Sequence, residues 1–121
     1  MKIIAEALVA LAALLHFWFL VLEMFLWQKP LGLKTFRMGQ KLAKDTAILA
    51  KNQGLYNGFL ASGLTWSLIA PDPVLAYPLK LFFLGCAIVA GVYGALTASP
   101  RIFWAQAFPA LVALGLVLAA E

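Results

Sequence analysis

The side chains of this sequence that could do chemistry are a few polar groups placed inside long apolar segments. His16 and Glu23 lie in the first apolar run, and Asn52, Gln53 and Asn57 open the second. Such groups are costly at membrane depth unless they face other protein, where they hold helices together or bind a ligand. Glu23 could supply a charge or a titratable proton, and the amides could orient a small polar molecule.

His16 and Glu23 are seven residues apart, which places them within about 20° on one helical face and about 10 Å apart along the helix axis. Two ligands two turns apart serve a metal ion poorly, so no metal site is predicted. His16 could act in a proton relay or form a structural hydrogen bond. The sequence has no Ser-His-Asp set, phosphate loop or haem-type histidine pair, and we expect no cofactor.

The elements that must position these groups are transmembrane helices. The chain has 121 residues, 64% hydrophobic and 12% charged, whereas soluble domains carry about 25% charged residues. Four apolar runs approach or exceed the roughly 18–20 residues that cross a hydrocarbon core. These runs predict one all-α transmembrane domain over residues 1–121, an up-down-up-down four-helix bundle. Its spans are residues 3–27, 46–70, 75–98 and 102–120.

The segment between the first two spans, residues 28–45, is basic. Its net charge equals the +4 of the whole chain, a positive-inside pattern that excludes a nucleic-acid footprint. We therefore expect a bacterial inner-membrane protein with this loop in the cytoplasm and both termini outside. The loop is either an interfacial helix that contacts anionic lipid or a solvated segment, and Asp45 is expected to cap the second span. Its charged residues are Lys29, Lys34, Arg37, Lys41, Lys44 and Asp45.

This topology brings polar residues from all four spans to one depth in the cytoplasmic half, while the outer half has almost nothing comparable. One interhelical hydrogen bond in a membrane contributes about 0.6 kcal/mol, and this layer exceeds what a bundle needs. It predicts a pocket that opens toward the cytoplasm. The candidate ligand-binding residues are Glu23, Trp27, Asn52, Gln53, Tyr56, Asn57, Tyr93 and Gln106.

Small residues recur at spacings of three or four in the second and third spans. They allow neighbouring helix backbones to approach closely, and several such faces favour a homo-oligomer. In the fourth span, Pro109 is expected to kink the helix. The candidate packing residues are Gly54, Gly58, Ser62, Gly91 and Gly94.

Four segments of the chain, residues 23–27, 52–61, 90–94 and 106–110, resemble a small bacterial family of integral membrane proteins catalogued as a domain of unknown function. The most specific of them is the Asn-Gln-Gly-x-x-Asn-Gly run at residues 52–58. The resemblance implies four membrane spans over nearly the whole chain. It implies no activity.

Three functions are compatible with these residues. The favoured hypothesis is binding or transport of a small polar or amphipathic ligand through the pocket. In this hypothesis the chain is embedded in the lipid bilayer. A membrane-embedded enzyme acting on a lipid or quinone-like substrate would use Glu23 and His16 as acid and base, but their separation argues against it. A structural or regulatory subunit of a larger complex would dock a partner through the glycine faces.

Overall fold

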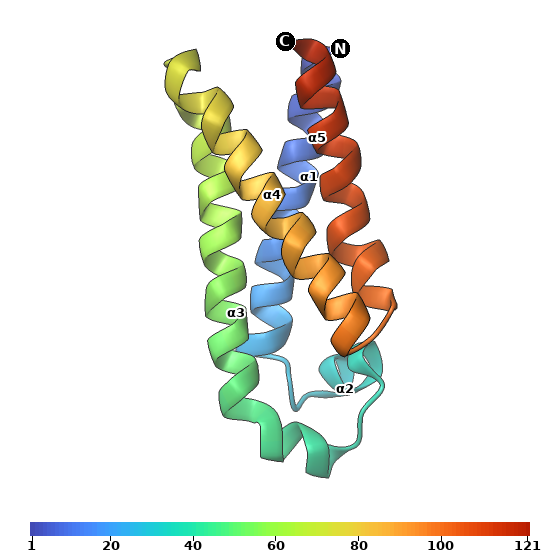
Figure 1. The fold of residues 1–121 in the computed structure, drawn as a ribbon. Coiled ribbons are helices and arrows are strands. Elements are labelled where there is room, and N and C mark those ends of the chain that lie inside the picture. Colours follow the sequence, from blue (N-terminus) through green and yellow to red (C-terminus); the bar gives the residue numbers. More distant parts are fainter. The chain divides into compact units, whose positions relative to one another are not determined.

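The computed structural model describes residues 1–121 as helices joined by short connections, with no strand (Figure 1). The chain divides into two compact units, residues 1–15 with 60–121 and residues 16–59, which are described separately as unit 1 and unit 2. The α-helices are α1 (Lys2–Met24), α2 (Pro30–Phe36), α3 (Gln40–Ile69), α4 (Pro73–Thr97) and α5 (Phe108–Ala120), and the π-helical turn η1 (Phe103–Ala107) precedes α5.

Three helical segments are long and apolar enough to cross a membrane: α1, α4 and Phe103–Ala120. The predicted all-helical class is therefore confirmed, and the composition is that of a membrane protein. Helix α3 has 30 residues, but it is not among these candidates. The amides of Asn52, Gln53 and Asn57 lie within its sequence and lower its mean hydropathy. Its membrane crossing is therefore a proposal, not a finding.

Small side chains fill the core of unit 1. The core joins the first turns of α1 and the end of α3 to α4 and α5, because residues from all four helices form one buried cluster. In Figure 1, α4 and α5 run antiparallel, and both chain termini lie at the same end of this unit. Alanines at the contacts let the helices approach closely. The fully buried members include Val9, Leu64, Leu84, Ala87, Ala110 and Ala113.

The chain between α4 and α5 packs back onto α4 through two glycines. A methyl group on Gly91 would lie 2.6 Å from the backbone nitrogen of Ala107, and one on Gly94 would lie 2.9 Å from the Cγ2 atom of Ile102. Real Cβ atoms do not approach other atoms this closely. These two positions, which the sequence marks as packing residues, set the distance between α4 and η1.

The expected disturbance at Pro109 takes the form of a π-helical turn immediately before α5. Proline has no N–H group and its ring clashes with the carbonyl group four residues earlier. In η1 the N–H group of Phe108 instead donates to the carbonyl oxygen of Phe103, five residues back. This wider turn keeps the Phe103 carbonyl group hydrogen-bonded next to a proline that cannot donate a hydrogen bond.

We expect Gly91→Ala to destabilise unit 1 by about 2 kcal/mol, because the added methyl group meets backbone that cannot rotate away. The free energy of unfolding would be measured by titrating the protein from mild detergent into SDS. Gly85→Ala is the matched control in the same helix, because no atom lies within 4 Å of its new methyl group. Equal stability of the two variants would contradict the close contact between α4 and η1.

In unit 2, most of the expected basic loop is helical. Pro30 and Gly32, which could mark a turn, instead lie in α2, because the fixed backbone angle of Pro30 suits the first helical position. The backbone of Arg37 then adopts a left-handed conformation, φ 52° and ψ 52°, which ends α2. The segment is therefore largely helical, and its contact with anionic lipid stays a prediction.

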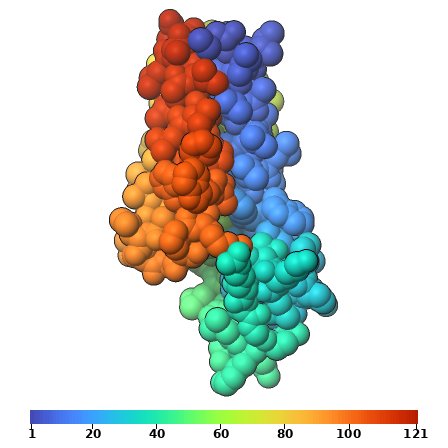
Figure 2. Space-filling view, turned by 90° about the vertical axis from the view of Figure 1, so that its right-hand side faces the viewer, coloured from blue at the N-terminus to red at the C-terminus, as the bar shows by residue number.

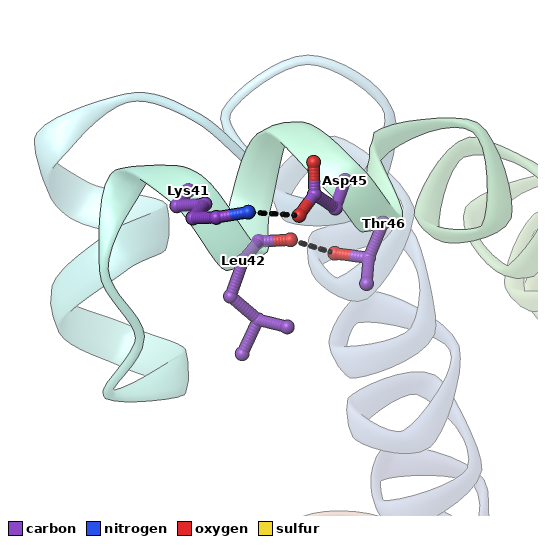
Figure 3. Close-up of polar contacts among 4 residues, drawn as sticks. All are labelled: Lys41, Leu42, Asp45 and Thr46. Atoms are coloured by element: carbon purple, nitrogen blue, oxygen red, sulfur yellow. Dashed lines mark hydrogen bonds and ion pairs between the residues drawn. The ribbon is translucent and has the colours of Figure 1, made fainter.

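Helix α3 begins at Gln40, six residues before the expected start of the second span. Asp45 is therefore inside the helix and does not cap it. Its carboxylate forms an ion pair with Lys41 at 3.4 Å, and the Thr46 hydroxyl donates to the Leu42 carbonyl oxygen at 2.7 Å (Figure 3). Both contacts join residues four apart, a spacing that supports a helix across this polar stretch.

Candidate functional site

The predicted pocket residues fall into both units. Glu23, Trp27 and the four candidates of α3 lie in unit 2, together with His16, whereas Tyr93 and Gln106 lie in unit 1. The structure describes each unit by itself, so a single layer built from all four spans stays a prediction. Within unit 2, two of the predicted residues, Glu23 and Asn57, are in direct contact.

The Asn57 side-chain amide donates a hydrogen bond of 2.5 Å to the Glu23 carboxyl group. Both side chains are buried, at 7% and 8% exposure, so the bond is shielded from solvent and from lipid. Asn57 is the polar partner that the structure gives Glu23, and Glu23 forms no ion pair with a lysine or arginine. The partner of this carboxyl group is therefore a neutral donor. Burying a charged carboxylate beside a neutral donor costs more free energy than burying it in an ion pair.

Two glycines of α3 bring Asn57 to Glu23. A methyl group on Gly54 would lie 2.6 Å from the Cγ atom of Met24, and one on Gly58 would lie 2.6 Å from the Cδ1 atom of Leu20. These positions are one helical turn apart on the face of α3 that meets α1. Ser62, the third member of the expected small-residue strip, is exposed.

Trp27 is held between α2 and α3 just after α1 ends. Its indole Nε1 donates to the Thr46 hydroxyl oxygen at 3.1 Å, and its ring lies 4.7 Å from that of Phe36, centre to centre. Neither contact was predicted from the sequence. Thr46 could have been found only from the expectation that a part-buried indole N–H needs an acceptor.

An open cavity of ≈ 330 Å³ lies beside Trp27. It combines two lysines with aromatic and other apolar side chains, so it could hold an anionic group next to an apolar chain. Glu23 and Asn57 do not line it, although Met24 and Phe25 directly follow Glu23. The lining residues are Met24, Phe25, Trp27, Gln28, Lys29, Ala47 and Lys51.

The other candidates of α3 point away from this contact. Asn52 and Gln53 are exposed, and the Tyr56 side chain, 59% exposed, stacks edge-on against Phe59 with ring centres 5.5 Å apart. The amides therefore do not converge as expected, because Asn57 alone lies on the α1 side of the helix. Figure 2 shows the segment from α2 to the start of α3 exposed on the surface of unit 2.

His16 is 1% exposed and packs edge-on against Phe19, with ring centres 5.3 Å apart. Its burial agrees with a structural role, and its part in a proton relay stays a hypothesis. In unit 1, Tyr93 is 69% exposed, whereas Gln106 is half-buried within η1, next to the Gly91 contact.

Comparison with known proteins finds relatives whose function is not described. A family model described as "Protein of unknown function (DUF1304)" matches residues 10–118. The chain is also 31% identical over 116 residues to "Uncharacterized protein YpaA" of Lactococcus lactis subsp. lactis (strain IL1403), covering 94% of this chain and 96% of that protein. No solved structure matches the chain.

Proposed function

This chain belongs to the DUF1304 family, and we propose that it is an integral membrane protein that binds an amphipathic molecule with an anionic head group in the cavity beside Trp27. The observation that carries the proposal is the pair of lysines, Lys29 and Lys51, in one cavity with Phe25 and Trp27. Lysine ammonium groups attract phosphate or carboxylate, and the aromatic rings offer an apolar surface beside them.

The depth of the cavity supports this ligand class. Helix α1 ends at Met24, and the cavity is lined by the residues that follow it directly. Tryptophan and lysine at the end of a membrane-crossing helix are typical of the headgroup level of a bilayer. A molecule entering from the membrane would bring its charged head to the lysines and leave its chain in the hydrocarbon.

The buried contact between Glu23 and Asn57 gives the cavity a fixed geometry. One wall of the cavity follows Glu23 in the chain, and the other wall, with Ala47 and Lys51, belongs to α3 as Asn57 does. The hydrogen bond therefore links the chain segment of one wall to the helix of the other. We therefore assign Glu23 and Asn57 as positioning residues. They do not contact the ligand, but they hold the cavity walls in place.

A fourth membrane span formed by α3 is part of the same proposal. Its 30 residues would extend about 45 Å, longer than a hydrocarbon core of about 30 Å. The polar first half of α3 would then lie partly at the headgroup level, with Asn57 satisfied by Glu23. An even number of spans agrees with the two termini at one end of unit 1. The basic residues of 28–45 favour the cytoplasm for the cavity and the outside for the termini.

Ligand binding would be tested by Trp27 fluorescence in a variant that carries Phe at Trp18, Trp66 and Trp104. Lysophospholipids with one acyl chain and different head groups would be titrated into protein in neutral detergent. We expect the phosphatidylglycerol form to bind at least about tenfold more tightly than the phosphatidylcholine form, because only the former leaves a net negative charge at the lysines. Lys29→Met with Lys51→Met should abolish this preference.

Lys44→Met is the matched control, because Lys44 is an exposed lysine of α3 outside the cavity. If it removes the head-group preference as completely as the double variant does, general surface charge explains the binding and the cavity does not. Transport would need a second measurement, the movement of a fluorescent lysolipid across vesicles that contain the protein.

A structural subunit is the second candidate, and the exposed face of α3 favours it. Tyr56 and Phe59, both more than half exposed, lie on this helix near the exposed amides of Asn52 and Gln53. Amide side chains on a membrane helix commonly pair with a neighbouring helix. A second copy of the chain on this face would be detected by mass measurement of the detergent-solubilised protein, and Tyr56→Ala with Gln53→Ala should return it to the monomer.

A further inference from the structure

A second cavity, of ≈ 420 Å³, lies in unit 1 at the end that carries the two termini. Its volume falls in the range of roughly 300–1,000 Å³ that small-molecule sites occupy. Leucine and valine side chains line part of it, and charged and phenolic side chains line the rest. The polar members are Lys2, Glu6, Ser67, Tyr77, Lys80 and Glu121.

Lys80 is the unusual member of this cavity, because its side chain is buried at 9% exposure. Its ammonium group donates to the carbonyl oxygen of Ser67 at 3.0 Å and forms no ion pair with a carboxylate. An ammonium group has three hydrogens to donate. The contact with Ser67 therefore uses one of them and leaves the positive charge without an anionic partner.

The contact with Ser67 has a structural value of its own. Ser67 lies in the last turn of α3, which ends at Ile69, and the carbonyl groups of a last turn have no partner within their helix. A lysine donating there also faces the negative end of the helix dipole. The contact between Lys80 and Ser67 explains one hydrogen bond of the ammonium group. It does not explain why a charged group is buried at the edge of a cavity.

Buried charges without a charged partner are destabilising unless something else offsets them. Lys80 is also seven residues into α4, a helix able to cross a membrane, where ionisable residues commonly mark ligand or ion sites. This arrangement could not be seen from the sequence, in which Lys80 is a single lysine near the start of the span expected over residues 75–98.

We propose that this cavity binds a singly charged anionic group, a carboxylate or a phosphodiester, against the ammonium group of Lys80. The molecule that carries the group is amphipathic, and its chain lies along Leu68 and Val117, which also line the cavity. Glu6 and Glu121 line the same space and form no ion pair with Lys80. Their negative charge disfavours anions with two or more charges, such as inorganic phosphate.

This site is independent of the function proposed above, because all of its residues lie in unit 1 and none of them lines the cavity beside Trp27. Variants at Lys80 can therefore be tested in protein in which Lys29→Met and Lys51→Met have removed the ammonium groups of the other cavity. Failure of one proposal leaves the other standing.

The test is equilibrium dialysis of the full-length protein that carries Lys29→Met and Lys51→Met, in neutral maltoside detergent. Radiolabelled decanoate and decanol form the matched pair, and protein-free micelles give the background. We expect decanoate to bind and decanol to bind at least tenfold more weakly. Lys80→Met should weaken decanoate binding at least tenfold, Lys80→Arg should retain it, and Lys44→Met, at an exposed lysine outside both cavities, should leave it unchanged.

A second arm uses lysophosphatidylglycerol as a competitor of decanoate. Binding of either anion that depends on Lys80 supports the site. Which of the two anions binds shows whether the site takes a carboxylate or a phosphodiester. If Lys80→Met does not fold, decanoate binding is measured in the Ala70→Trp variant instead. This change narrows the cavity at Ala70 without removing a charge, and binding should fall. Binding of neither anion, or equal binding with and without the change at Lys80 or Ala70, would overturn the proposal.

Discussion

Gly32→Ala is expected to destabilise the protein by about 3 kcal/mol or more, the upper part of the range for overpacking. A methyl group on Gly32 would lie 2.0 Å from the Leu26 carbonyl oxygen and 2.7 Å from that of Trp27. Both are backbone atoms, so no side-chain rotation relieves the clash. Because α2 could no longer lie against the chain that follows α1, the contact between Trp27 and Phe36 should also be lost.

The measurement for Gly32→Ala is SDS titration for the free energy of unfolding, together with the fluorescence of Trp27 in the single-tryptophan variant. Gly39→Ala is the control from the same segment, since its added methyl group has no atom within 4 Å. The control should change stability by no more than about 0.5 kcal/mol. A Gly32→Ala protein as stable as this control would show that α2 does not pack closely against residues 26 and 27.

Asn57→Leu should cost about 3 kcal/mol, the second large effect expected. The change removes the donor that the structure gives the buried Glu23 carboxyl group and leaves that group without a partner. Replacing both partners is expected to cost less than replacing Asn57 alone, because the double variant Glu23→Leu with Asn57→Leu contains no buried unpaired group. The free energies of the four proteins form a double-mutant cycle.

A coupling of more than about 1 kcal/mol in this cycle is the expected result. Asn52→Leu is the matched control, an asparagine of the same helix that is exposed, and it should change stability by less than about 0.5 kcal/mol. Additive effects of the Glu23 and Asn57 substitutions would show that the two side chains do not interact. Because these residues join the walls of the cavity beside Trp27, Asn57→Leu should also weaken ligand binding there.

The two cavities could not have been located from the sequence. The cavity beside Trp27 combines residues of two predicted spans with Gln28 and Lys29 of the expected basic loop. Helix α2 and the early start of α3 give that loop its shape. Lys80 was visible only as a charge near a predicted helix start. Its burial depends on the end of α3 folding beside α4, so that the Ser67 carbonyl oxygen meets its ammonium group.

What the sequence determined by itself is the class of protein and part of one contact. Long apolar runs predict helices because backbone groups in lipid must pair within their own segment. The four-residue spacing of Gly54 and Gly58 marks a face for close approach, and Asn57 lies beside it. The span predicted over residues 46–70 stays a prediction, since α3 is not among the helices long and apolar enough to cross a membrane.

Only the tertiary structure decided which polar groups meet. Amides on one helix lie on different faces, so that Asn57 bonds to Glu23 while Asn52 and Gln53 are exposed. A linear pattern gives the depth of a side chain along a helix, but its partner depends on how the helix is rotated against its neighbours. In this protein, glycines and alanines set that rotation by allowing backbones to touch at some positions and excluding contact at others.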